Sequence, residues 1–200
     1  LGDSTAGAGN LNTGGQSFAM YANPSGAFST AIRSFSSPLA TNDQFSFQMG
    51  VNFDNGNKGF NLRTAGDSIF NFNVGSGGSV SSPKSGTTLN PGAGAGYDYG
   101  GNDALIDIVL QVISPSEISY EISRTSSLGL QGNLFTGTVT GITASINNFE
   151  FYISDTDDGS AQNNLYFNNL SVSTVPEPGT YALLFGCFAL IWAALRRRKT

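Results

Sequence analysis

Histidine is absent from this 200-residue chain, and cysteine occurs once, at Cys187. The absence of histidine excludes the commonest general base, the Ser-His and Cys-His nucleophile pairs and the commonest transition-metal ligand. A single cysteine allows neither an intramolecular disulfide nor a cysteine-type zinc site. Any binding or catalysis must therefore use groups other than imidazole and thiolate pairs.

Basic residues are also scarce. Four of the nine Lys and Arg residues lie in the final run, which leaves five basic and thirteen acidic residues before position 175 and a net charge near −8 there. This charge argues against nucleic acid and against anionic membrane surfaces as partners of that part. The chain begins at Leu1 without a basic and apolar leader ahead of the domain, so we expect that a signal peptide of an exported precursor has been cleaved or omitted, or that this chain is a C-terminal fragment.

The C-terminal tail has three parts: a proline-rich hinge, an uncharged apolar run over 180–195 and a basic end. The run predicts a transmembrane helix of roughly 24 Å, short of the ~30 Å hydrocarbon core unless the flanking arginines snorkel. The basic residues favour the cytoplasmic side, which places the preceding residues outside. The hinge consists of Val175, Pro176, Glu177 and Pro178, and the basic end of Arg196, Arg197, Arg198 and Lys199.

This order of hinge, helix and basic stop resembles the PEP-CTERM protein-sorting domain of Gram-negative bacteria. The resemblance implies an exosortase, a membrane cysteine protease and transpeptidase, as a partner that processes the tail. It also implies an exported protein, anchored in the cell envelope by 180–195 before processing and then found at the cell surface or in a biofilm matrix with exopolysaccharide. The alternatives are a buried helix of a soluble domain and a single-pass anchor without processing.

Residues 1–173 read as one all-β domain, followed by the sorting signal over 174–200. Over Gln44–Phe53, large apolar residues alternate with polar ones, which predicts a strand with one buried face, and Ser68–Val74 repeats the pattern. The turn residues of 54–57 predict a hairpin from the first strand to Lys58–Thr64. Ala104–Ile113 is apolar on both faces except at Asp107 and Gln111, which predicts a central strand between layers.

Roughly ten strands with polar turns predict a two-sheet, jelly-roll-like sandwich. The remaining predicted strands are Ser17–Ala22, Gly26–Phe35, Thr87–Leu89, Ser116–Ser123, Leu134–Thr140, Asn147–Ile153 and Asn163–Val172. The stretch Gln44–Val74 and the closing Leu-Tyr-Phe-Asn-Asn-Leu run of 165–170 resemble the jelly rolls of the concanavalin A-like lectin and glucanase group. This second resemblance implies an architecture, not a function.

The densest acidic cluster is a candidate Ca²⁺ site, formed by Asp155, Asp157 and Asp158 with Gly159 behind them. Alternating carboxylate oxygens suit this hard cation, which takes six to eight oxygen ligands. The cluster lacks the closing glutamate of an EF-hand loop. The competing interpretation is a solvated turn, because Asp and Gly are ordinary turn residues.

Tyrosines outside the inward phenylalanine pattern are candidates for carbohydrate contact, with Asn148, Glu150, Asn168 and Asp98 near them in sequence. The competing interpretation is packing at sheet edges with the hydroxyl in water. A third interpretation, glycan hydrolysis, needs two carboxylates in one groove, and Glu117 and Glu121 share a strand face only with serines. The candidate tyrosines are Tyr97, Tyr99, Tyr152 and Tyr166.

The sequence therefore predicts a non-catalytic exported surface or matrix protein, with no required cofactor and Ca²⁺ as a possible ligand. The alternative is a lectin-like carbohydrate-binding module, assisted or not by calcium.

Overall fold

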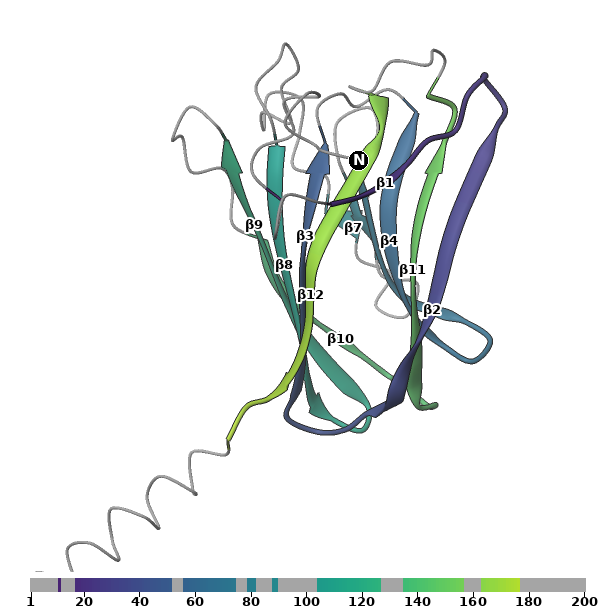
Figure 1. The fold of residues 1–200 in the computed structure, drawn as a ribbon. Helices are drawn as coiled ribbons and strands as arrows, with labels where there is room; N and C mark the ends of the chain where they lie inside the picture. Colours follow the sequence, from purple (N-terminus) through teal and green to yellow (C-terminus); the bar gives the residue numbers. More distant parts are fainter. Residues whose placement is uncertain are drawn as a thin grey trace, which may run out of the picture.

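The computed structural model describes residues 11, 17–51, 56–74, 79–81, 88–89, 104–126, 135–156 and 163–176. In this part of the chain, twelve strands form two six-stranded antiparallel sheets that pack face to face (Figure 1). Sheet 1 contains, in spatial order, β1 (Phe18–Met20), β12 (Leu165–Thr174), β3 (Asp43–Val51), β8 (Ala104–Ser114), β9 (Glu117–Ser126) and β10 (Phe135–Thr140). Sheet 2 contains β2 (Phe28–Leu39), β11 (Ile146–Ser154), β4 (Asn57–Thr64), β5 (Ser68–Val74), β6 (Ser79–Ser81) and β7 (Thr88–Leu89).

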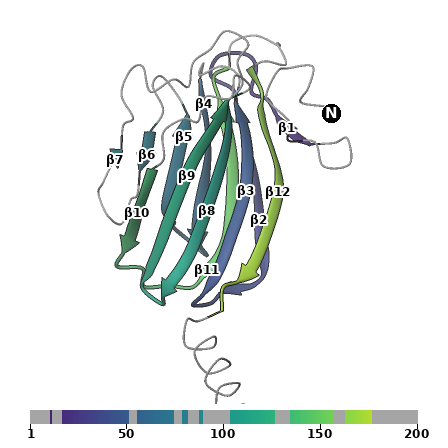
Figure 2. The ribbon, with the colours of Figure 1, turned by 90° about the vertical axis from the view of Figure 1, so that its left-hand side faces the viewer.

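The prediction of an all-β two-sheet sandwich is confirmed, and each predicted strand lies within a few residues of an observed one. The short strand β6 was not predicted. In β3 the alternation predicts burial correctly, because Phe45, Phe47, Met49 and Val51 all lie in the core. In Figure 2, sheet 1 faces the viewer and β12, β3, β8 and β9 run side by side.

The predicted hairpin through 54–57 is wrong. β3 pairs with β12 and β8, whereas β4 pairs with β11 and β5, so the chain crosses from one sheet to the other between them. Gly56 has a φ of 65°, the left-handed conformation expected of a turn residue. A turn signal fixes only the local chain reversal; the two strands face each other across the core, where the ring centroids of Phe47 and Phe60 lie 4.4 Å apart.

The prediction that β8 lies between layers is also wrong. β8 is interior to sheet 1, between β3 and β9, but only one of its faces meets the other sheet. Its core face holds Ile106, Ile108 and Leu110, while Ile113 is exposed and Asp107 accepts a hydrogen bond from Gln48 Nε2 at 2.6 Å. The face of β8 away from the core is therefore not buried under a second layer.

Aromatic rings fill the space between the sheets. Phe47 of sheet 1 contacts Phe60 and Phe151 of sheet 2, with centroid distances of 4.4 and 5.2 Å. Phe151 also stacks on Phe167 of β12, with ring centroids 4.0 Å apart and an angle of 9° between the ring planes. These contacts join the two sheets through one core.

The end of β12 is tied to the turn that joins β2 to β3. Thr174 Oγ1 donates to Asp43 Oδ1 at 2.8 Å, and the Val175 N–H donates to the Asn42 carbonyl at 2.8 Å. Within the described residues, no helix is long and apolar enough to cross a membrane. The predicted helix over 180–195, together with Glu177, Pro178 and the basic residues of 196–199, lies outside the described residues.

Candidate functional site

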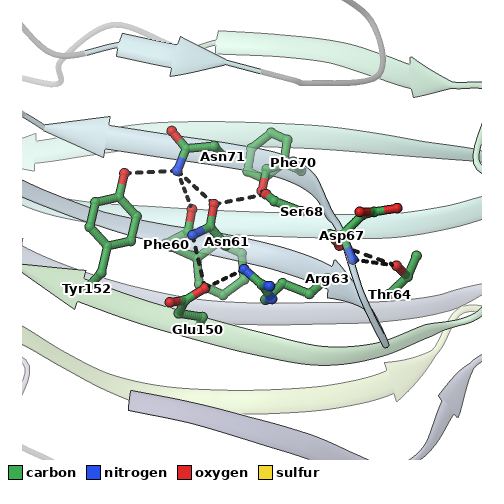
Figure 3. Close-up of polar contacts among 10 residues, drawn as sticks. All are labelled: Phe60, Asn61, Arg63, Thr64, Asp67, Ser68, Phe70, Asn71, Glu150 and Tyr152. Atoms are coloured by element: carbon green, nitrogen blue, oxygen red, sulfur yellow. Dashed lines mark hydrogen bonds and ion pairs between the residues drawn. The ribbon is translucent and has the colours of Figure 1, made fainter. Parts of the chain in front are cut away.

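The outer face of sheet 2 carries a network of polar side chains from β4, β5 and β11 (Figure 3). The strand period explains the placement. Phe60, Phe72 and Phe151 point into the core, so the residues that alternate with them point outward. Ser68 is the exception: the register of β4 and β5 shifts between Leu62 and Arg63, and this shift sets Ser68 opposite Arg63. We call this set the polar face; its members are Asn61, Arg63, Ser68, Asn71, Asn73, Glu150 and Tyr152.

An ion pair anchors the polar face. Arg63 Nη1 lies 2.7 Å from Glu150 Oε2, and the Arg63 and Glu150 side chains are 27% and 9% exposed. Asn61 Nδ2 donates to the same carboxylate oxygen at 3.2 Å. Because the register sets Asn61 opposite Glu150, backbone pairing alone brings these groups together. The pair leaves this patch with no net charge.

Asn61 links the ion pair to a chain of amides. Its Oδ1 accepts hydrogen bonds from Ser68 Oγ at 2.9 Å and from Asn71 Nδ2 at 2.8 Å. Asn71 Nδ2 and Asn73 Nδ2 each also donate to the Tyr152 hydroxyl oxygen at 2.8 Å. These hydrogen bonds therefore hold the Tyr152 ring and the three amide groups in place without a ligand.

A glycine makes room for the Tyr152 ring. A Cβ atom at Gly59, the cross-strand partner of Tyr152, would overlap the ring carbon and hydroxyl oxygen of that side chain. The ring thus lies close against β4, while Phe28, 63% exposed, stacks beside it with centroids 6.5 Å apart. Ile32, opposite Glu150 on β2, is exposed as well. An apolar edge therefore borders the polar face.

Several polar atoms of this face have no protein partner within the described residues. They are Glu150 Oε1, Asn73 Oδ1 and Arg63 Nη2, which offer two acceptors and a charged donor. The Tyr152 hydroxyl accepts two hydrogen bonds and keeps its own proton to donate. The face thus presents donors and acceptors side by side.

We expect Tyr152→Phe to lower the free energy of unfolding by about 1–2 kcal/mol, because the Asn71 and Asn73 amides both lose the hydroxyl oxygen as an acceptor, and Asn73 Nδ2 has no other acceptor among the described residues. Chemical denaturation measures the difference. Tyr21→Phe is the matched control, since Tyr21 is exposed, and it should change stability by less than about 0.5 kcal/mol. Equal effects of the two substitutions would contradict the role assigned to the Tyr152 hydroxyl.

Burial raises the pKa of the Tyr152 hydroxyl above 10.0, outweighing the hydrogen bonds from Asn71 and Asn73, and Glu150 raises it further. Because this pKa is higher in the folded state, the stabilisation is fully present below pH 10.0 and is lost as the pH rises through the folded pKa. We therefore expect the stability of the wild type to fall more steeply above that pH than the stability of Tyr152→Phe. Parallel pH curves for the two proteins would be inconsistent with this shift.

The structure separates Tyr166 from Tyr152. Tyr166 lies on sheet 1, 2% exposed, and packs with Leu11 rather than with Tyr152. Tyr97 and Tyr99 lie outside the described residues. Of the two predicted tyrosines that the structure describes, Tyr152 belongs to the polar face and Tyr166 does not.

The candidate calcium cluster is only partly described. Asp155 has a φ of 55°, and its Oδ1 accepts a hydrogen bond from the Gly26 N–H at 2.6 Å, which joins two loops. Asp157 and Asp158 lie outside the described residues. Among the residues that the structure does describe, no three His, Cys, Asp or Glu side chains group as a metal site. Calcium binding stays a prediction.

Asn61, Arg63, Asn71 and Asn73 were not predicted as site residues from the sequence. A usable signal was present: on β4 and β5 these residues alternate with buried phenylalanine and leucine. Arg63 is moreover one of only five basic residues before the tail. Only the pairing of β11 with β4 shows that Glu150 and Tyr152 join them.

No protein-family model matches this chain, and no curated protein matches it by sequence. Similar solved structures include a toad ovary galectin in complex with thio-digalactose (12% identity, TM-score 0.42, covering 72% of this chain and 98% of that one). A CBM2 module from the evolved Dit of Lactobacillus casei BL23 phage J-1 has 17% identity and a TM-score of 0.44, covering 74% and 70%. A sialidase has 14% identity and a TM-score of 0.45, covering 74% of this chain and 14% of that one. These similarities assign no residue or ligand, and the fold assignment rests on the strand pairing itself.

Proposed function

We propose that the polar face binds neutral carbohydrate and that the protein is a non-catalytic glycan-binding component of the cell surface. The observation that carries this proposal is the preorganised network of Asn61, Asn71, Asn73 and Glu150 beside the Tyr152 and Phe28 rings. A sugar hydroxyl both donates and accepts, so it pairs with a face that offers both kinds of group. The C–H side of a sugar ring packs on an exposed aromatic ring such as Phe28.

Charge favours neutral glycans over acidic ones. The Arg63 charge is held by Glu150 at 2.7 Å, so an incoming carboxylate or sulfate would have to compete for it. The net charge near −8 before position 175 also repels polyanions. Neutral hexose polymers neither compete with Glu150 for Arg63 nor are repelled by the negative charge of the domain.

The chemistry of the face supports binding rather than hydrolysis. Glycoside hydrolysis ordinarily uses two carboxylates roughly 5–10 Å apart. The polar face holds one, Glu150, and its Oε2 is already engaged by Arg63 and Asn61. We therefore assign Glu150 the role of a hydrogen-bond acceptor for hydroxyls.

A glycan array probed with the purified protein tests this function. We expect retention on neutral glycans, little on uronic acid or sulfated glycans, and loss of retention in Asn61→Ala. Thr138→Ala is the matched control, because Thr138 is an exposed β10 residue of the other sheet, and it should bind like the wild type. An array on which no glycan is retained, or on which both variants bind alike, would refute the proposal.

The tail supplies the proposed route to the surface. Its Pro176-Glu177-Pro178 hinge, apolar run and basic end favour export, membrane anchoring through 180–195 and processing by an exosortase. Exopolysaccharide would then be the neighbouring glycan. No family model supports this assignment, so it rests on the order of the three parts.

If the tail is processed, the mature protein should lack the predicted helix. Intact mass of protein recovered from the cell surface decides this, because Trp192 and the basic end would be missing. Full-length protein at the surface, with Trp192 still present, would show that the tail is an anchor without processing.

A further inference from the structure

Four turns meet at the end of the sandwich where β12 ends (Figures 1 and 2). The strand pairs Thr174–Asp43, Ser114–Glu117 and Ile146–Thr64 bring them together. We call this surface the tail end; it consists of the turns 40–42, 65–67, 115–116 and 141–145.

The chain leaves the domain from a fixed point on the tail end. Besides the bonds from Thr174 and Val175, the Asn42 N–H donates to the Val112 carbonyl at 2.8 Å, which ties the 40–42 turn to β8. Asp43 Oδ2 also accepts the Ala40 N–H at 2.9 Å, which closes this turn. Val175 therefore cannot move away from the turns without breaking these bonds.

The linker from this point to the apolar run is short. Thr180 is the fifth residue after Val175, and a fully extended chain covers at most about 18 Å over five residue steps. The headgroup layer alone takes up roughly 5–7 Å of this distance. A membrane-anchored chain must therefore hold the tail end against, or just above, the headgroups.

We propose that the tail end is the membrane-facing surface of the anchored protein and that its turns rest on the phospholipid headgroups. This inference rests on the anchoring part of the proposed function and adds the orientation of the domain. Glu150 lies four residues along β11 from Ile146, about 13 Å above the tail end. The polar face then opens sideways, toward polymer lying along the membrane.

The composition of the tail end fits a lipid surface. Asp67 is the only charged residue in the sequence of its four turns, so little charge must be desolvated on contact. Ile113, 43% exposed, lies beside them. A hollow of about 440 Å³ opens there between Leu39, Val112, Ile142 and Ile146. Without Lys or Arg in these turns, contact should not depend on anionic lipid.

Headgroup proximity can be measured on the full chain in phosphatidylcholine vesicles. In a Cys187→Ser background, a fluorophore is attached at Ala144→Cys in the tail end or at Ser25→Cys as the control. Ser25 is exposed and lies beyond the opposite end of β11, about 26 Å higher. The quencher is a nitroxide on the lipid headgroup.

We expect several-fold stronger quenching at Ala144→Cys than at Ser25→Cys, and loss of the difference when a long Gly/Ser spacer follows Pro178. Equal quenching in protein that floats with the vesicles would overturn the orientation while leaving the anchor intact. Protein that does not float with vesicles would overturn the anchor and the orientation together, and would leave the glycan-binding proposal untouched.

Discussion

Phe47→Ala should lower the free energy of unfolding by about 3–5 kcal/mol, the largest effect expected of a single substitution in this sandwich. The Phe47 ring is 2% exposed and lies at the centre of the aromatic core. It touches Phe45 of its own strand and Phe60 and Phe151 of the other sheet, at centroid distances of 5.2, 4.4 and 5.2 Å. Truncation leaves a cavity where the two sheets meet.

Ser46→Ala is the control for this substitution. Ser46 is the neighbouring residue of the same strand but points to the outer face, opposite Val109 and Ser171. It should change stability by no more than about 0.5 kcal/mol. Similar shifts in the midpoint of denaturation for Phe47→Ala and Ser46→Ala would mean that the register of β3 is wrong.

Glu150→Ala should cost about 2–3 kcal/mol, because the Arg63 guanidinium and the Asn61 amide both lose their acceptor in a partly buried setting. Arg63→Ala should cost less, since the guanidinium is the more exposed partner. Combining the two substitutions should cost less than the sum of the single effects, with a coupling of about 1–2 kcal/mol. Denaturation of the four proteins of this cycle measures the coupling, and strict additivity would show that the ion pair contributes nothing.

Strands and their buried faces were largely predictable from the sequence. In β3, β4, β5 and β11 large apolar residues alternate with polar ones, and this period of two directly reports which side chains face the core. Ile118, Tyr120 and Ile122 follow the same rule in β9 and are buried. Local alternation, however, says nothing of which strands become neighbours.

Pairing between strands that are far apart in the sequence determines which strands share a sheet and which side chains form the polar face, and neither could be predicted from local patterns. The 54–57 segment has the residues of a hairpin turn, yet β3 and β4 belong to different sheets, because each of them finds its partners far away in the chain. The polar face has the same origin. Asn61 and Glu150 are 89 residues apart and meet only because β4 and β11 pair. Single residues such as Tyr152 were predictable, whereas the set was not.

The central claim is that neutral glycan binds on the polar face of sheet 2. Side-chain amide resonances report this most directly, because Asn61, Asn71 and Asn73 lie within the network while Asn168 and Asn169 lie on sheet 1. Titration with a glycan identified on the array should shift the resonances of Asn61, Asn71 and Asn73 in a saturable way and leave those of Asn168 and Asn169 in place. Saturable shifts confined to Asn168 and Asn169, or no shifts at any of the five, would contradict the claim.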